Sequence, residues 1–132
     1  MSEENVEIAR GFFEASDLKT AFDAVAEDVV YAFHGESRRL SGAEELSGKP
    51  AALKWMVDWF SRFRDYRFAI EEVCDWDDRV LVVTVHHAKG RASGVPIREQ
   101  TAQVITVRDS KITRQEFYDG RAEAVKAAGP SE

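Results

Sequence analysis

The chain has 132 residues, of which 44% are hydrophobic and 32% charged, so it is long enough to bury one hydrophobic core. Its formal net charge of −6 argues against binding to nucleic acid or to anionic membranes, because both need a basic face. The single cysteine excludes an intramolecular disulfide, and the opening MSEENVEIAR lacks the basic and apolar regions of a secretory leader. The longest apolar runs are far shorter than the roughly 20 residues that span a bilayer. We therefore expect one domain over residues 1–132, located in the cytoplasm.

Two helices are predicted at the start of the chain. Val6, Ala9 and Phe13 recur at helical spacing after an acidic start, which predicts a helix over roughly residues 3–16. Asp17 is suited to cap a second, short helix, because its carboxylate can accept a backbone N–H. The face that this second helix would bury carries Leu18, Ala21, Phe22 and Val25.

The next segment is predicted to pass from a short strand at residues 28–34 into a loop at residues 35–48. This loop has three glycines, mostly polar residues and room for one helical turn, and could form the rim of a pocket. A third helix is predicted to begin at Pro50, because a first helical turn does not need the N–H that proline lacks. Trp55 and Trp59, four residues apart, widen its apolar stripe on one side. That stripe contains Leu53, Met56, Val57, Phe60 and Phe63.

Most of the second half of the chain is predicted to be strand. The predicted strands cover residues 66–75, 79–89, 97–108 and 111–118, with short turns typical of an antiparallel meander. A closing helix over roughly residues 121–128 ends at Gly129 and Pro130. Helices grouped first and strands grouped last predict an α+β fold, in which the N-terminal helices pack on the concave face of a curved antiparallel sheet. Such a sheet and a few helices cannot close completely, so we expect a cavity on the concave side.

Three stretches, RGFFEASDLKTAFDAVAEDVVYAF, GVPIREQTAQVITVRDSKIT and QEFYDGRAEAVKAAG, carry a resemblance to known families. With the order of elements over nearly the whole chain, they resemble the SnoaL-like and ketosteroid isomerase-like families of the nuclear transport factor 2-like superfamily. The resemblance implies the cone fold of that superfamily and a homodimer through the outer face of the sheet. It implies no single activity, because these families include isomerases, cyclases, epoxide hydrolases and non-enzymes.

The catalytic residues of ketosteroid isomerases are mostly replaced at the similar positions of this chain. In that family a tyrosine on the first helix and an acid on a late strand form an oxyanion hole, and an aspartate on the first strand moves the proton. The similar positions here are Phe12, Gln103 and Phe33. Two of the three roles are lost, including that of the base, so steroid isomerisation by that mechanism is not expected.

The water-activating residues of limonene epoxide hydrolases are also mostly replaced. In that family a tyrosine and an asparagine help to hold water near an aspartate–arginine–aspartate relay. The tyrosine is retained as Tyr31, whereas Phe33 replaces the asparagine and Thr84 replaces the arginine. His86 and Phe117 stand in place of the two aspartates. SnoaL-type cyclases use an acidic residue as acid/base, and no carboxylate here matches that position.

The stretch VLVVTVHHAKG, residues 80–90, places two adjacent histidines at the end of a strand, where neighbouring side chains point to opposite faces. The resemblance places His86 on the inner face and His87 on the outer face with Val83 and Val85. The inner face of the same strand then carries Val80, Val82 and Thr84. The inner faces of the next two strands carry Glu99, Thr101, Gln103 and Ile105, then Thr113, Gln115 and Phe117.

These positions predict an aromatic pocket with a few polar groups, as is usual for a small-molecule site. His86 is the candidate general acid/base, and Tyr31 could donate a hydrogen bond to a developing oxyanion. The other candidate ligand-binding residues are Phe33, Trp55, Trp59, Thr84, Gln103, Gln115 and Phe117.

Two functional hypotheses follow from this pocket. The first is a cofactor-independent isomerase, cyclase or hydrolase acting on an apolar carbonyl, hydroxyl or epoxide compound. The alternative is a non-catalytic module of the same fold that binds a small apolar molecule or docks on protein through its outer sheet.

No metal or cofactor is expected. Adjacent His86 and His87 diverge on a strand, which leaves His34 as the only other histidine, and no nucleotide-binding motif is present. Cys74 is predicted to share a strand face with Phe68, Ile70 and Trp76, so we expect a buried, unreactive thiol.

Overall fold

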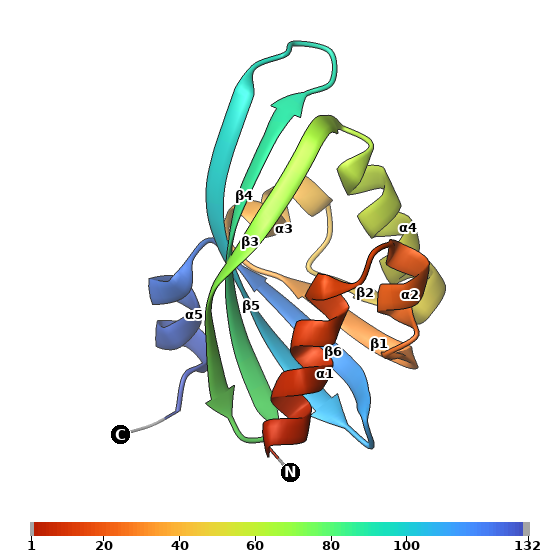
Figure 1. Cartoon of the computed structure of the whole chain (residues 1–132), viewed down its shortest axis with the longest axis vertical. Coiled ribbons are helices and arrows are strands. Elements are labelled where there is room, and N and C mark those ends of the chain that lie inside the picture. Colours follow the sequence, from red (N-terminus) through yellow and green to blue (C-terminus); the bar gives the residue numbers. More distant parts are fainter. Residues whose placement is uncertain (1, 131–132) are drawn as a thin grey trace.

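A six-stranded sheet forms the centre of the molecule (Figure 1). The computed structural model describes residues 2–130, so residues 1, 131 and 132 of the predicted domain lie outside the described residues. In spatial order the strands are β2 (Glu45–Ser47), β1 (Val25–Phe33), β6 (Lys111–Tyr118), β5 (Pro96–Arg108), β4 (Arg79–Gly90) and β3 (Phe63–Trp76). The helices are α1 (Ser2–Glu14), α2 (Leu18–Phe22), α3 (Glu36–Ser41), α4 (Lys49–Phe60) and α5 (Arg121–Ala128).

The sheet is antiparallel from β3 to β6, which confirms the predicted meander. β1 differs, because it pairs antiparallel with β2 but parallel with β6. A parallel pair needs a long connection, and residues 34–110 between these two strands provide one. Helices α1, α2 and α4 cover one face of the sheet, and α5 lies on the opposite face (Figure 1). The fold is therefore α+β, as predicted. Within residues 2–130, no helix is long and apolar enough to cross a membrane.

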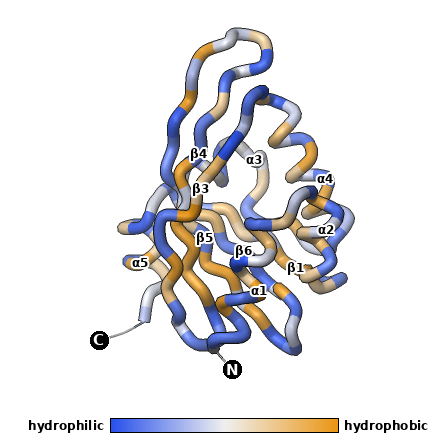
Figure 2. The backbone as a smooth tube through the Cα atoms, in the orientation of Figure 1, coloured by the Kyte–Doolittle hydropathy of each residue, from blue (hydrophilic) through white to orange (hydrophobic). Residues whose placement is uncertain are grey.

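Each face of the sheet has its own hydrophobic cluster, and Figure 2 shows the hydrophobic residues along β1, β5 and β6. Alternation along β4 supplies both clusters, because Val80 and Val82 point to the inner face while Leu81 and Val83 point to the outer one. The outer cluster lies under α5, through Ala124. The sheet is thus shielded on both faces near its centre, and the helices on the concave face determine where a cavity forms.

The second helix is capped as predicted but is shorter than expected. The Asp17 carboxylate accepts a hydrogen bond from the backbone N–H of Thr20 at 2.7 Å. Val25, expected on the buried face of this helix, instead begins β1 and pairs with Ile112, and the N–H of Ile112 donates to the Ala24 carbonyl at 2.8 Å. Pairing with β6 therefore ends the helix and starts β1 three residues before the predicted strand.

The third helix ends earlier than its apolar stripe predicts. α4 begins at Lys49, so Pro50 lies in its first turn, but the helix stops at Phe60. Phe63 belongs to β3 and pairs with Gly90. Val57, predicted in the stripe, is 50% exposed, because Ala52 and Met56 occupy the buried side.

The predicted loop at residues 35–48 contains two short elements. α3 accounts for the expected helical turn, and β2 pairs with β1 so that Leu46 lies opposite Tyr31. A strand of three residues is too short to show a periodic pattern, so only its tertiary pairing defines it.

Two register shifts in β3 decide which of its side chains face inward. They lie between Arg64 and Arg67 and between Ile70 and Glu72. A bulge adds one residue and therefore exchanges the faces of the residues that follow. Ile70 packs with the inner cluster, whereas Cys74 and Trp76 pack with the outer one, so the predicted shared face is wrong.

Cys74 is half-buried rather than fully buried. Burial raises the pKa of its thiol, and the neighbouring Glu72 carboxylate, to which Sγ donates at 3.1 Å, raises it further. The thiol therefore remains protonated and a poor nucleophile at neutral pH, as expected for an unreactive cysteine.

A third register shift, in the pairing of β5 with β6, makes one of the predicted inward positions on β6 wrong. It lies beside Thr106 and Val107, and Ile112 rather than Thr113 packs into the inner cluster. The Thr113 hydroxyl donates instead to the Thr106 carbonyl at 3.4 Å.

Candidate functional site

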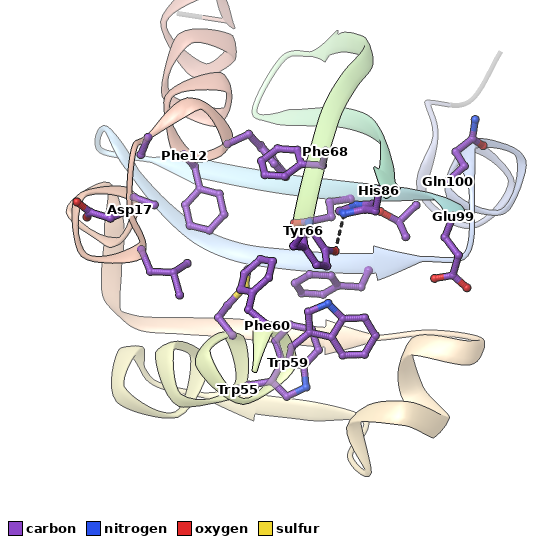
Figure 3. Close-up of a pocket in the computed structure, with 18 of the residues that line it drawn as sticks. Phe12, Asp17, Trp55, Trp59, Phe60, Tyr66, Phe68, His86, Glu99 and Gln100 are labelled. Atoms are coloured by element: carbon purple, nitrogen blue, oxygen red, sulfur yellow. Dashed lines mark hydrogen bonds between the residues drawn. The ribbon is translucent and has the colours of Figure 1, made fainter. Parts of the chain in front are cut away.

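A cavity of about 440 Å³ lies between the concave face of the sheet and the helices that cover it (Figure 3). This volume is within the usual range for small-molecule sites. Polar groups on its wall come mainly from β3, β4 and β5, namely Tyr66, His86, Glu99, Thr101 and Gln103. Its aromatic lining includes Phe12, Trp55, Trp59, Phe60, Phe68 and Phe117.

Helix α4 supplies the largest aromatic side chains. Trp55 and Trp59 lie one turn apart on that helix and stack with ring centroids 5.9 Å apart. Phe60 meets Tyr66 edge to face at 4.8 Å, which joins the helix to β3. These contacts hold the rings without a ligand, so the apolar part of the cavity is formed in advance.

His86 is fixed on the cavity wall by hydrogen bonds at both ring nitrogens. Its Nδ1 lies 2.6 Å from the Tyr66 hydroxyl, as marked in Figure 3. Its Nε2 lies 2.8 Å from the Thr84 hydroxyl and 2.9 Å from the Thr101 hydroxyl. The two threonine hydroxyls are themselves 3.0 Å apart. The imidazole thus links the cavity surface to a small polar network between β4 and β5.

Burial keeps the Tyr66–His86 pair uncharged at neutral pH. Burial, with a smaller contribution from the neighbouring His87, lowers the pKa of His86 to about 4. Burial also raises the pKa of the Tyr66 hydroxyl, and the Glu99 carboxylate adds to that increase. A low-dielectric wall penalises the charged form of either group.

A neutral imidazole has one donor and one acceptor nitrogen, so the hydrogen bonds of this pair can run in two directions. In one, Tyr66 donates to Nδ1 and the Nε2–H donates to a threonine oxygen. In the other, a threonine donates to Nε2, the Nδ1–H donates to Tyr66, and the tyrosine hydroxyl can donate into the cavity. One geometry can therefore offer a ligand an acceptor or a donor.

Tyr66 and Glu99 were not among the site residues predicted from the sequence. Tyr66 lies two residues from Phe68, which is opposite His86, and the register shifts in β3 bring it within reach of the imidazole. Glu99 lies directly opposite His86 on β5. Glu99 was placed on the inner face from the alternation of its strand, and that position alone could have marked it as a candidate.

The predicted ligand-binding residues divide into two groups. His86, Trp55, Trp59, Gln103 and Phe117 line the cavity. The remaining residues are buried behind that lining: Tyr31, Phe33, Thr84 and Gln115.

Polar groups behind the lining support its wall. Thr84 contacts the lining through His86 and Thr101, and Gln115 donates from Nε2 to Oε1 of Gln103 at 2.7 Å. His87 pairs with Arg67 and Arg98 on the two neighbouring strands, away from His86.

Within residues 2–130, no group of three or more His, Cys, Asp or Glu side chains could hold a metal ion.

Tyr31 is fully buried among aromatic rings. It contacts Trp55 and Phe117, and its hydroxyl has no hydrogen-bond partner among the described residues. Burial raises the pKa of this hydroxyl well above its usual value. Its predicted catalytic role therefore requires a route to the cavity past these rings.

Comparison with known families identifies one profile, that of the SnoaL-like domain, which matches residues 8–115. No curated protein matches the chain. The chain is similar to a nuclear transport factor 2-like protein of unknown function from Burkholderia pseudomallei, with a TM-score of 0.77, 17% identity, and 93% of this chain and 95% of that chain covered.

Two similar structures contain small molecules. TerC, crystallised with polyporic acid, has a TM-score of 0.74 and 20% identity, with 88% of this chain and 91% of that chain covered. A protein with a ketosteroid isomerase-like fold from Catenulispora acidiphila, in complex with trimethylamine, has a TM-score of 0.70 and 15% identity, with 95% and 94% covered. These likenesses show the fold.

The low pKa of His86 predicts a pH dependence of stability. In the unfolded chain His86 has an ordinary pKa near 6.5, whereas in the folded protein it becomes protonated only near pH 4. The unfolded state therefore binds more protons in this window, so stability falls as pH drops from 6.5 to 4, by up to about 3 kcal/mol. Urea unfolding at several pH values in this range should show that the free energy of unfolding changes less with pH in His86→Gln than in wild type. The outer-face variant His87→Gln should change this pH dependence much less than His86→Gln, because His87 is the smaller cause of the lowered pKa of His86. An equal pH dependence in wild type and His86→Gln would contradict the prediction.

The buried Tyr31 hydroxyl predicts a stabilising substitution. Tyr31→Phe removes a polar group without a partner among the described residues, so the free energy of unfolding should rise by about 1 kcal/mol. Tyr66→Phe is the matched control, because it removes a bonded hydroxyl and should lower that free energy by about 1–3 kcal/mol. Chemical denaturation measures both variants. A Tyr31→Phe variant that is less stable than wild type would show that the Tyr31 hydroxyl does make a stabilising hydrogen bond.

Proposed function

Because the chain belongs to the SnoaL-like domain family, we propose that it binds a small, largely apolar molecule with a polar group, such as a carbonyl or hydroxyl, in the cavity. The observation that carries this proposal is the neutral Tyr66–His86 pair set in the wall of an aromatic cavity of about 440 Å³. A pocket with apolar walls and a few placed polar groups is the usual form of a small-molecule site.

Each part of the cavity has a separate task in this proposal. The rings of α4 and the sheet, including Trp55, Phe60 and Phe117, exclude water and contact the apolar body of the ligand. The hydroxyl of Tyr66 then orients the polar group, accepting from a ligand hydroxyl or donating to a ligand carbonyl. The hydrogen bonds behind His86 hold that hydroxyl in place before the ligand arrives.

Two relatives with the same fold lend support, since TerC was crystallised with polyporic acid and the Catenulispora acidiphila protein with trimethylamine. Both structures pair this fold with a small molecule. They differ in the ligand, so the ligand of this chain must be argued from its own cavity wall.

Turnover by a cofactor-independent isomerase, cyclase or hydrolase is the second candidate function. The observation that favours it is a neutral imidazole joined through Tyr66 to the cavity, which could take up a proton as a general base. A pKa of about 4 makes this base weak at neutral pH, because general bases act best near the working pH. The positions similar to family acids and bases also carry Gln103 and Phe33. Binding is therefore the function that the site supports best.

A ligand screen with one substitution tests the proposal. Thermal shift with apolar ketones, epoxides, terpenoids, sterols and aromatic polyketides would first find a ligand, and calorimetry would then measure its Kd. Tyr66→Phe should weaken binding about five- to tenfold, because one hydrogen bond of roughly 1 kcal/mol is lost. His87→Ala, on the outer face, should leave the Kd unchanged. Equal Kd values for wild type and Tyr66→Phe would contradict the role of the pair, and any ligand found should be tested for turnover.

We also propose a homodimer formed through the outer face of the sheet. α5 covers one part of this face, over the outer cluster. The other part lies on β3, β4 and β5, where Arg67, His87 and Arg98 are cross-strand neighbours. A broad strand surface of this kind can pair with a second copy across a two-fold axis.

Size-exclusion chromatography with light scattering tests the dimer. At micromolar concentration the measured mass should be twice the 14.9 kDa of one chain. His87→Ala should shift the equilibrium towards monomer, whereas His86→Ala, inside the cavity, should not. A wild-type protein that elutes with the mass of one chain at this concentration would rule out the proposed dimer.

A further inference from the structure

The charged side chains that line the cavity are all acidic. They are Asp17, Glu36, Glu99 and Asp119, and among residues 2–130 no lysine or arginine lines the cavity. The imidazole of His86, which also lines the cavity, is neutral at pH 7 because burial lowers its pKa to about 4. The described lining therefore offers an anionic ligand no cationic side chain.

Three of these acids already have partners within the protein. Asp17 accepts the backbone N–H of Thr20 as a helix cap, and Asp119 accepts the backbone N–H of Glu36 at 3.0 Å. Glu36 itself pairs with Arg39 at 2.6 Å. Within residues 2–130, the Glu99 carboxylate has neither a hydrogen bond nor an ion pair. Glu99 is thus the acid of the cavity lining that is available to a ligand.

Glu99 lies beside the polar pair of the cavity. It is directly opposite His86 in the pairing of β4 with β5, and cross-strand partners on one face have side chains about 5 Å apart. Figure 3 shows it beyond His86, at the rim of the cavity. Its negative charge also contributes to the raised pKa of Tyr66, after the larger effect of burial. A ligand group that reaches Tyr66 is therefore within the field of this carboxylate.

We propose that Glu99 makes the cavity selective for ligands that carry a positive charge, such as a protonated amine joined to an apolar body, over neutral and anionic ligands of the same shape. This inference rests on the proposed function, because it names the ligand class of the same cavity. The ammonium group sits at the rim near Glu99, and one of its N–H groups donates to the Tyr66 oxygen while Tyr66 donates to His86.

Aromatic rings near the rim favour the same charge. The face of an aromatic ring is negative, so a cation over it is attracted. The Trp59 ring already has the Arg62 guanidinium 5.6 Å from its centroid, whereas no cation is recorded over the rings of Tyr66 and Phe68 among the described residues. An exposed ion pair and a cation–π contact are each modest, so together they predict a preference of roughly five- to twentyfold.

Three probes with one skeleton test this selectivity. They are a naphthylethyl amine, the corresponding alcohol and the corresponding carboxylate, and isothermal titration at low ionic strength gives each Kd. For wild type, the amine should bind roughly five- to twentyfold more tightly than the alcohol, and the carboxylate more weakly than either. In Glu99→Gln the preference for the amine should fall to the part that the cation–π contact supplies, roughly two- to fivefold at most, with the affinity for the alcohol unchanged.

The matched control is Glu123→Gln, which makes the same change in net charge on exposed α5, on the opposite face of the sheet. It should keep the wild-type preference for the amine. If wild type binds the alcohol at least as tightly as the amine, the charge selectivity is overturned and the proposed function stands. If Glu99→Gln keeps the preference, the assignment to Glu99 is overturned. If wild type binds none of the three probes, both this inference and the proposed function are overturned.

Discussion

The register of β3 against β4 is the constraint on which the candidate site depends, and two shifts in that register set it. Continued without a shift from the turn at Trp76 and Arg79, the pairing would place Ala69 opposite His86 and turn Tyr66 to the outer face. With the shifts, Phe68 lies opposite His86 and the Tyr66 hydroxyl reaches Nδ1. Within the first shift, Asp65 has a φ of 54°, a left-handed conformation that aspartate tolerates better than most side chains.

Burial of the resulting pair then decides what kind of chemistry the wall can support. Desolvation lowers the pKa of His86 and raises that of Tyr66, so both groups are neutral at the pH where most enzymes work. Each hydrogen bond of the imidazole is satisfied inside the protein, which favours a fixed recognition group over a mobile proton carrier. The acidic rim adds a negative field that the uncharged pair does not cancel. Recognition of a polar or cationic group is therefore better supported by this wall than strong general-base catalysis.

The cavity itself follows from how the helices are distributed. α1, α2 and α4 lean on the concave face, but their side chains meet the sheet mainly through the inner cluster. Towards the ends of β3, β4 and β5 the aromatic rings of α4 pack on one another and leave space beside them. On the other face, α5 covers the outer cluster, so the strands that carry the site are supported from behind at their centre.

The sequence by itself determined the order and type of the main elements, because long apolar segments bounded by turn residues, such as residues 79–89, form buried strands. With the inner face of β4 taken from the family resemblance, alternation also placed His86 and Gln103 correctly, because β4 and β5 have no extra residue before these positions. It did not identify Tyr66 as a site residue or place Cys74 correctly. A bulge is a local compromise between the twist of a strand and the packing of both its faces, and so depends on neighbours far away in the chain. Only the tertiary structure decided that Tyr66 meets His86, that Glu99 lies beside them without a partner among the described residues, and that Tyr31 stays behind the lining. Those outcomes depend on register and helix packing, which arise from contacts between distant segments rather than from local pattern.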